Sequence, residues 1–238
     1  MNANRRRKWG LTPIFLRVFA ALAALALLWV AWIAAHVAWY RYNPPRETAF
    51  MAQRMDDARA KNPAARLRYT WVPYARISPH LPRAMIAAED AKFVLHAGFD
   101  WEGIRNALDR NQRRGSVVAG GSTITQQLAK NLFLSPAKSY ARKGEEAVVT
   151  LLLEAMLPKQ RILELYLNVI EWGDGVFGAE AAAQRYFRIP AAQLSAEQAA
   201  RLAAMAPSPR RFERNPDSDY LAGRVVTILA RMPSATVP

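Results

Sequence analysis

The 238-residue sequence contains no cysteine. This absence excludes a disulfide framework, a thiol nucleophile and a cysteine metal site, so cysteine usage leaves the cellular compartment open. The sequence also lacks internal repeats, low-complexity tracts and long runs with the alternating pattern of a strand. It lacks the G-x-x-x-x-G-K-[ST] loop of nucleotide-binding proteins as well. The lack of strand-like runs favours a mainly α-helical domain, and the lack of the loop argues against nucleotide binding of that type.

The N-terminal region has no acidic residue ahead of a long apolar run. Residues 18–40 carry no charge and are interrupted only by His36. At about 1.5 Å per residue this run crosses a hydrocarbon core of roughly 30 Å, whereas the apolar stretch of a cleaved signal peptide is only about 7–15 residues long. The basic residues before the run place the N-terminus in the cytoplasm and the rest of the chain outside. They are Arg5, Arg6, Arg7, Lys8 and Arg17.

The chain therefore divides into four parts. We expect a basic cytoplasmic tail at 1–17, one transmembrane helix at 18–40, a proline-containing juxtamembrane connector with one short helix at 41–75, and one domain at 76–238. The length leaves no room for a second catalytic domain. When the five basic residues of the tail are left out, 28 of the 33 basic residues remain, against 19 acidic residues. This excess attracts anionic headgroups or phosphate-bearing ligands, while nucleic acid is not expected outside the cytoplasm. A merely soluble basic surface is the alternative.

Helical periodicity recurs along the domain. Thr123 followed by Gln126 forms a capping box, so a helix begins just after the pair Gly120–Gly121. A basic, glycine-containing loop from Arg110 to Gly121 precedes it. Further helices are expected at 79–95, 139–157, after Pro158, at 179–187 and at 195–206, with a glycine turn at 173–178.

The first candidate for chemistry is Glu89. Ile86, Glu89 and Phe93 are spaced i, i+3, i+7, which puts an acid into an apolar stripe of the 79–95 helix. Desolvation there would raise the pKa of Glu89 and make it a candidate proton acceptor or donor. The alternative is a carboxylate at the edge of the stripe, paired with Lys92. His96, close to the end of this helix, is either a ligand or, as is more common, a residue that caps the last carbonyl groups and packs.

A second candidate is a group of charges around the apolar segment 147–153. Arg142 and Lys143 lie i, i+4 and i, i+3 from Glu146, so two cations and one acid share a helix face. They form either an ordinary surface ion-pair cluster or the wall of a cleft beside a helix that we expect to be buried on most sides. Lys130 would add a point charge, and the Gly-Gly pair allows close approach of a ligand to the backbone. Together the three cations could hold a diphosphate.

Five ordered segments resemble the motifs of the family 51 glycosyltransferases, which polymerise the lipid-linked disaccharide of bacterial peptidoglycan. The match is specific because the segments occur in order. The Gly-Asp-Gly turn makes the chain similar to monofunctional members of Gram-negative bacteria. The segments are EDAKFVLHAGFD (89–100), GGSTITQQLAKN (120–131), RKGEEA (142–147), ILELYLNVIEWGDGVFGAEAAAQRYF (162–187) and AARLAAMAPSP (199–209).

The resemblance implies a mainly α, lysozyme-like glycosyltransferase domain with a larger and a smaller membrane-proximal lobe. It implies that Glu89 deprotonates the acceptor sugar, that Lys130, Arg142 and Lys143 neutralise the undecaprenyl diphosphate leaving group, and that Glu146 orients cations or substrate. A divalent cation, with Mg²⁺ as the expectation, is the implied cofactor; its ligands are unknown. The positions that match motif residues shaping the substrate site are Asp90, Phe93, His96, Ser122, Thr123 and Gln127.

The implied partners are lipid II, the growing glycan strand, the inner membrane, and other cell-wall synthesis or division proteins. The implied location is a single-pass protein of the bacterial inner membrane, with the catalytic domain in the periplasm. A lytic or hydrolytic lysozyme-like enzyme is the nearest alternative, but it needs no diphosphate clamp. A non-catalytic membrane scaffold is a further alternative. The S-x-x-K sequence at Ser135–Lys138 is interpreted as a chance match to acyl-enzyme nucleophiles, because no K-T-G follows.

Overall fold

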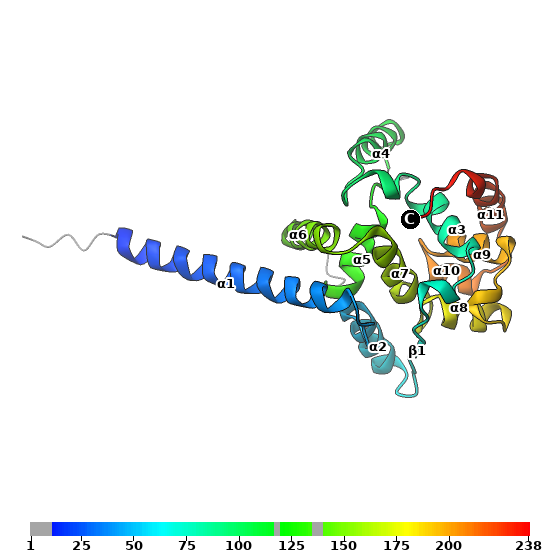
Figure 1. The fold of residues 1–238 in the computed structure, drawn as a ribbon, viewed down its shortest axis with the longest axis horizontal. Helices are drawn as coiled ribbons and strands as arrows, with labels where there is room; N and C mark the ends of the chain where they lie inside the picture. The colour runs from blue at the N-terminus through cyan, green and yellow to red at the C-terminus, as the bar shows by residue number, and fades with distance from the viewer. Residues whose placement is uncertain (1–10, 117–119, 135–139) are drawn as a thin grey trace, which may run out of the picture.

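The computed structural model describes residues 11–116, 120–134 and 140–238. It begins with helix α1 (Leu11–Tyr40), which projects from the remainder of the protein (Figure 1). Within the described residues, Ile14–Tyr40 is the one helix long and apolar enough to cross a membrane, and only 6% of its most apolar window is buried. The predicted apolar helix is therefore confirmed. The basic residues Arg5 to Lys8 lie outside the described part.

The region expected to be a connector carries regular structure that packs on the domain. Helix α2 (Ala49–Lys61) is capped by Thr48, whose hydroxyl accepts a hydrogen bond from the Met51 N–H at 3.2 Å. The Met51 and Met55 side chains are fully buried, and α2 packs on α5 (Ile124–Phe133). The sequence showed little periodicity here because α2 buries only these two side chains. Residues 41–75 are therefore more than a connector, because they include a helix that packs on the domain.

The chain after α2 is mainly helical. The predicted helices after Gly121, after Pro158, at 179–187 and at 195–206 are confirmed as α5, α7, α8 and α9. The helices are α3 (His80–Glu89), α4 (Trp101–Arg114), α6 (Tyr140–Met156), α7 (Lys159–Val169), α8 (Ala179–Phe187), α9 (Ala196–Met205), α10 (Pro209–Arg214) and α11 (Asp219–Arg231). Short 3-10 turns are η1 (Tyr74–Arg76), η2 (Phe93–Leu95), η3 (Ala191–Gln193) and η4 (Met232–Ser234).

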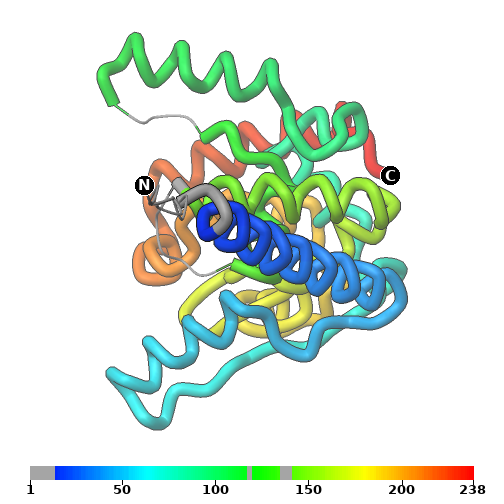
Figure 2. Tube along the Cα trace, turned by 90° about the vertical axis from the view of Figure 1, so that its left-hand side faces the viewer, coloured from blue at the N-terminus to red at the C-terminus, as the bar shows by residue number. Residues whose placement is uncertain are grey.

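Three expectations about these helices were wrong. The helix expected over 79–95 ends at Glu89, because Asp90 leaves helical geometry at φ −159° and residues 93–95 form only a 3-10 turn. Arg110 to Arg114 belong to α4 and not to a loop; the helix ends at Gly115 in the left-handed conformation (φ 61°). The segment 147–153 is buried on one face only, since Leu151 is 55% exposed. Figure 2 shows α4 (green) standing away from the other helices.

A small sheet was not expected either. Strands β1 (Arg68–Tyr69), β3 (Val176–Phe177) and β2 (Glu171–Gly173) pair in the order β1-β3-β2, and the predicted glycine turn joins β2 to β3. Its glycines are spaced G-x-G-x-x-G, but Gly173 and Gly175 belong to the antiparallel hairpin of β2 and β3, and only Gly178 lies between a strand and a helix, as the N-cap of α8. Gly178 has φ +82°, and a Cβ there would lie 2.4 Å from the Asn168 carbonyl oxygen.

The helices form two groups that meet at the end of α3. Helix α5 packs on α6 and α7, while α3 packs on α9 and α11. Figure 1 shows α6, α5 and α7 on the side of α1, and α3, α9 and α11 on the opposite side. The last residue of α3 is Glu89, so this acid lies where the two groups join.

Candidate active site

Glu89 is held on both carboxylate oxygens. Its side chain is only 13% exposed. Oε2 accepts a hydrogen bond from Gln127 Nε2 at 3.0 Å, and Oε1 lies 3.5 Å from Arg224 Nη2 of α11. The side-chain amide oxygen Oε1 of Gln127 in turn accepts a hydrogen bond from the Tyr166 hydroxyl at 3.0 Å. Burial raises the pKa of Glu89, while Gln127 and Arg224 partly offset that rise.

The predicted edge-carboxylate alternative is wrong. The Lys92 ammonium pairs with Glu102 at 2.6 Å, and both side chains are largely exposed. Glu89 instead faces the groups of α5, α7 and α11 named above. The expected apolar surroundings do exist, because Ile86 and Phe93 are fully buried, although Phe93 lies beyond the end of α3.

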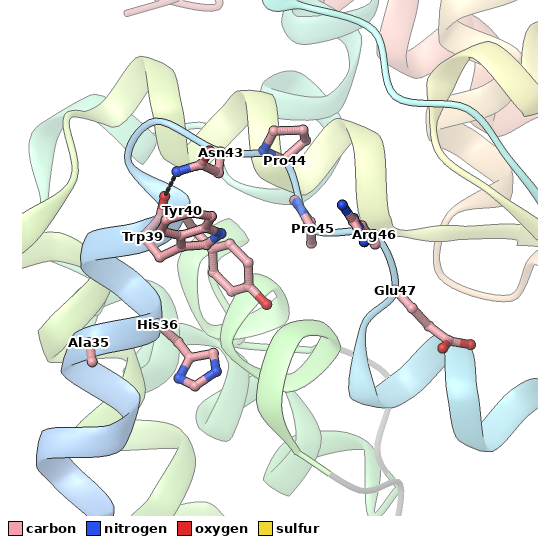
Figure 3. A pocket seen from close by; sticks show the side chains of 9 residues that line it. All are labelled: Ala35, His36, Trp39, Tyr40, Asn43, Pro44, Pro45, Arg46 and Glu47. Atoms are coloured by element: carbon pink, nitrogen blue, oxygen red, sulfur yellow. Dashed lines mark hydrogen bonds between the residues drawn. The ribbon is translucent and has the colours of Figure 1, made fainter.

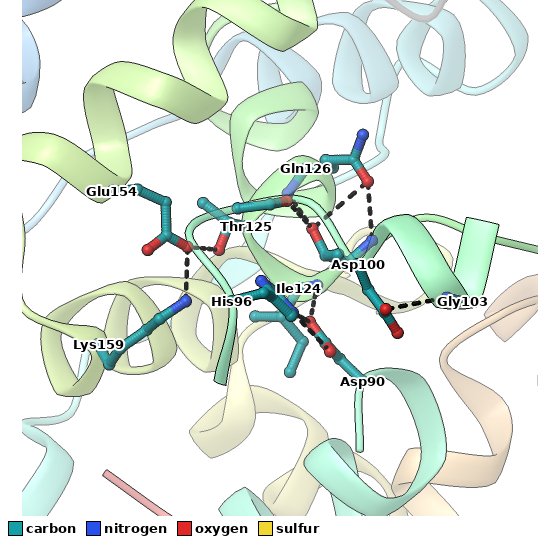
Figure 4. Close-up of polar contacts among 11 residues, drawn as sticks. Asp90, His96, Asp100, Gly103, Ile124, Thr125, Gln126, Glu154 and Lys159 are labelled. Carbon is teal, nitrogen blue, oxygen red and sulfur yellow. Dashed lines mark hydrogen bonds and ion pairs between the residues drawn. The ribbon is translucent and has the colours of Figure 1, made fainter. Parts of the chain in front are cut away.

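Asp90 connects the end of α3 to the start of α5. Its Oδ2 accepts a hydrogen bond from the Ile124 N–H at 3.0 Å, and its Oδ1 lies 2.9 Å from His96 Nε2 (Figure 4). The capping role considered for His96 is therefore wrong, since its ring binds a carboxylate. The Phe93 ring meets the His96 ring edge to face, with centroids 6.5 Å apart. Asp90, Phe93 and His96 thus form one packed support behind Glu89.

The capping box at Thr123 is confirmed. The Thr123 hydroxyl oxygen accepts a hydrogen bond from the Gln126 N–H at 3.2 Å, and Gln126 Oε1 accepts one from the Thr123 N–H at 3.0 Å. The Thr123 hydroxyl also donates to the Gly98 carbonyl at 2.7 Å. This second contact fixes the segment before α5 against the loop that follows Phe93.

A cavity of about 260 Å³ opens beside Glu89. Its lining includes Glu89 at the end of α3, Asp90 just after it, the segment Gly120–Thr123 with Ser122 in it, and two cations, Arg110 and Arg231. The Gly-Gly pair thus lines the cavity beside Glu89, and its close approach to a ligand stays a prediction. A cavity of about 810 Å³ lies instead at the C-terminal end of α1, between His36 and Glu47, and none of the predicted site residues lines it (Figure 3).

The predicted cations gather around Glu146. Its side chain is 1% exposed; Oε1 binds the Lys143 ammonium, and Oε2 lies 3.7 Å from Arg142 Nη1. The neighbouring Glu145 is exposed, so Glu146 is the acid that faces this cluster. Lys130 joins it from α5: burial lowers the pKa of Lys130, and the Glu146 carboxylate partly offsets that effect.

Lys130 links the two acidic positions. Its ammonium interacts electrostatically with Glu146, Lys143 and Arg142, and also with Glu89. Gln127 on the same helix as Lys130 binds Glu89, and α5 packs on α6, so a desolvated carboxylate and three cations from two helices lie in one region of the molecule. Such an arrangement suits a reaction in which a base accepts a proton while fixed positive charge stabilises an anionic leaving group.

Two residues of this site were missed by the sequence reasoning. Tyr166 lies in the apolar stripe of α7, where a tyrosine is usually a core residue, so its position gave no sign of a role in the site. Arg224 lies in α11, for which no helix was predicted, and no motif includes it. The only signal for α11 was its helical periodicity after Ser218, whose hydroxyl caps the helix.

The described residues contain no group of three or more His, Asp or Glu side chains that could hold a metal ion by itself. Glu146 is engaged by Lys143 and Arg142, and Asp90 by His96 and the start of α5. A divalent cation would therefore need oxygen ligands from the substrate. The S-x-x-K sequence at Ser135–Lys138 lies outside the described residues.

Comparison with known proteins agrees with this geometry. Residues 56–233 match the family model described as transglycosylase. The chain is 63% identical over 194 residues to the biosynthetic peptidoglycan transglycosylase of Dechloromonas aromatica, covering 82% of this chain and 84% of that protein. It is 50% identical over 228 residues to the protein of the same description from Chromobacterium violaceum, covering 96% of this chain and 100% of the relative. The chain thus belongs to the transglycosylase family.

Proposed function

We propose that the protein is a peptidoglycan glycosyltransferase that polymerises lipid II into β-1,4-linked glycan strands. The Glu89 carboxylate takes the proton of the acceptor GlcNAc 4-hydroxyl. The acceptor oxygen forms a bond to the anomeric carbon of the donor MurNAc, and the bond from that carbon to the diphosphate oxygen breaks with inversion. Undecaprenyl diphosphate leaves with the bonding electron pair. The buried, desolvated position of Glu89 supports its role as the base.

The leaving group is stabilised by Lys130, Arg142 and Lys143. A diphosphate oxygen gains negative charge as its bond to the sugar breaks, and fixed cations in a partly desolvated site stabilise that charge without reorganising. Glu146 holds Arg142 and Lys143 beside Lys130 and contacts no other described cation. In this role Glu146 orients the cations and does not transfer a proton.

The remaining site residues shape the substrate pocket. Gln127 fixes the Glu89 carboxylate, and Asp90 with His96 and Phe93 fixes the backbone next to it. Ser122 and Thr123 line the cavity beside Glu89, where the acceptor sugar would enter. This assignment gives each of these side chains a positioning role.

A divalent cation, with Mg²⁺ as the expectation, is part of the proposal. Mg²⁺ in phosphate-processing sites is usually held by one or two carboxylates together with substrate phosphates. Glu146 Oε2 is buried and accepts no hydrogen bond from the described residues, so Glu146 is the chain's candidate ligand. When bound, the ion would supply additional positive charge to the diphosphate.

The location follows from α1. We propose that this helix spans the bacterial inner membrane once, with the N-terminus in the cytoplasm and the catalytic domain in the periplasm. The partners are then lipid II and the growing glycan strand, with other cell-wall synthesis or division proteins as further candidates. No nucleic acid is expected to bind the outer domain.

The observation that carries the proposal is that buried Glu89, bound by Gln127 of α5, lies beside the helix that carries Lys130, and that this helix packs on α6 with Arg142, Lys143 and Glu146. A lytic or hydrolytic enzyme would not need these cations. The full chain in detergent with lipid II and Mg²⁺ should form glycan strands, and Glu89→Gln should not. If an active homologous enzyme forms strands in parallel while the wild-type chain forms none, the proposal is wrong. Cleavage of preformed strands would instead support the lytic alternative.

A further inference from the structure

Arg224 approaches Glu89 from the part of the chain beyond the five sequence motifs. It lies in the middle of α11, which packs against α3 and α9. Its Nη2 is 3.5 Å from Glu89 Oε1, and its side chain is 30% exposed. Its Nε is buried without a hydrogen-bond partner among the described residues. Among the carboxylates of the described residues, Glu89 is therefore the one that the Arg224 guanidinium faces.

The contacts of Glu89 are asymmetric. Oε2 receives a hydrogen bond from the neutral Gln127 amide, which Tyr166 holds from the other side. Oε1 has no such short contact and faces the Arg224 charge at 3.5 Å. A separation of this length leaves Oε1 open to a proton from a substrate hydroxyl. It also keeps a positive charge close enough to favour the ionised carboxylate.

The other charged groups near Glu89 either lower its pKa less than Arg224 does or raise it. The neighbouring Asp90 carboxylate raises the pKa of Glu89, as does burial, whereas Lys130 of α5 lowers it less than Arg224 does. The Tyr166 hydroxyl of α7 is buried, and its own pKa is raised well above the usual value. Arg224 is thus the cation with the largest effect on Glu89.

We propose that Arg224 is a positioning residue that fixes the Glu89 carboxylate from α11 and favours its ionised form. This inference rests on the proposed function, in which Glu89 must be ionised to accept a proton. Arg224 acts through Glu89 and not on the diphosphate. It therefore extends the active site to a helix near the C-terminus, outside the segments that carry the family resemblance.

The test compares pH profiles of kcat/KM for strand formation from lipid II in detergent. The variants are Arg224→Gln, Arg224→Lys and Arg201→Gln. Arg201 is the matched control because it carries the same charge but pairs with the exposed Asp217 at 3.7 Å. In Arg224→Gln the acidic limb should move to higher pH, since a base works only when it is ionised. Loss of positioning should lower kcat on the order of tenfold to a hundredfold.

The outcomes separate this inference from the proposed function. Wild-type activity establishes the reaction, independently of Arg224. With that activity present, a displaced acidic limb in Arg224→Gln, with Arg224→Lys and Arg201→Gln close to wild type, supports the inference. A uniform loss at every pH, a rise in KM alone, or equal displacement in the Gln and Lys variants overturns it. If Arg224→Gln does not fold, Arg224→Met, which keeps an apolar stem, provides the same comparison.

Discussion

Arg161 Nε donates a hydrogen bond of 2.7 Å to the carbonyl oxygen of Tyr40, the last residue of α1. The same guanidinium donates to the Asn43 carbonyl at 2.9 Å and pairs with Glu164 at 2.6 Å. It also lies over the Trp71 ring at 5.1 Å. One side chain of α7 therefore satisfies carbonyl groups at the end of α1, where helical hydrogen bonds run out.

We expect Arg161→Ala to loosen the junction between α1 and the domain. The change leaves the Glu164 carboxylate without its cation and two carbonyl groups without their donor, so the free energy of unfolding should fall by about 3 kcal/mol. Thermal unfolding in detergent measures this loss, and hydrogen exchange of the backbone at residues 40–43 should rise. Arg201→Ala at the exposed surface is the control; equal effects of the two changes would contradict the prediction.

Replacing the candidate base should cost activity but not stability. Because burial raises the pKa of Glu89 in the folded state, its stabilising contribution is present below the ordinary value and is lost as the pH rises through the folded-state value. The melting temperature of Glu89→Gln relative to wild type should therefore increase from acidic to neutral pH. Strand formation should fall by about 10²–10⁴-fold.

The matched control for that experiment is Glu145→Gln, which removes an exposed carboxylate of α6. It should change neither the pH dependence of the melting temperature nor the rate by a comparable amount. A Glu89→Gln variant that unfolds at neutral pH would show that the carboxylate stabilises the fold, contrary to this prediction.

Lys130→Met should separate catalysis from folding. Burial disfavours the charged ammonium and lowers the pKa of Lys130, so an apolar side chain of similar length should fit without loss of stability. The loss of one fixed cation from the leaving-group site should lower kcat by about 10²–10³-fold. Circular dichroism and strand formation measure the two effects, and Lys61→Met, an exposed position on α2, is the control. Lost helicity in Lys130→Met would assign a structural role to the lysine.

Gly178→Ala should destabilise the fold. The residue has φ +82°, and the new Cβ would lie 2.4 Å from the Asn168 carbonyl oxygen. Asn168 also binds both the N–H and the carbonyl of Val72, each at 3.0 Å, so it has little freedom to move. We expect a loss of about 3 kcal/mol or more in the free energy of unfolding.

Gly223→Ala is the comparison for that change. Gly223 lies inside α11, and its new Cβ would meet no atom within 4 Å. Alanine should therefore stabilise α11 by up to about 1 kcal/mol, because glycine is the poorer helix former. Chemical denaturation of both variants tests the contrast; equal effects would mean that the close approach to Asn168 is not what requires glycine.

Local sequence signals predicted the elements that depend on neighbouring residues. Thr123 and Gln126 predicted the start of α5, because a capping box is complete within one helical turn. The helix containing Glu89 was predicted too long, because Phe93 continues the apolar spacing while Asp90 bends away to bind the Ile124 N–H. That hydrogen bond joins segments distant in the sequence, so no local pattern contains it.

In the site, too, contacts within one helix could be predicted, whereas contacts between distant segments could not. Arg142, Lys143 and Glu146 share one helix, and their contact follows from helical spacing. The link between Glu89 and Arg224 depends on how α11 packs on α3, which periodicity does not determine. The sheet was missed for a similar reason, since two of its three strands have only two residues.

The attachment of α1 to the domain limits where the enzyme can act. Arg161 and Arg41 bind carbonyl groups on either side of the junction, and only residues 41–48 separate α1 from α2. With α1 in a bilayer, the cleft can neither swing outward nor extend on a flexible tether. For the lipid-linked substrate proposed above, turnover would then depend on its surface density and lateral diffusion in the membrane, and hardly at all on concentrations in the surrounding solution.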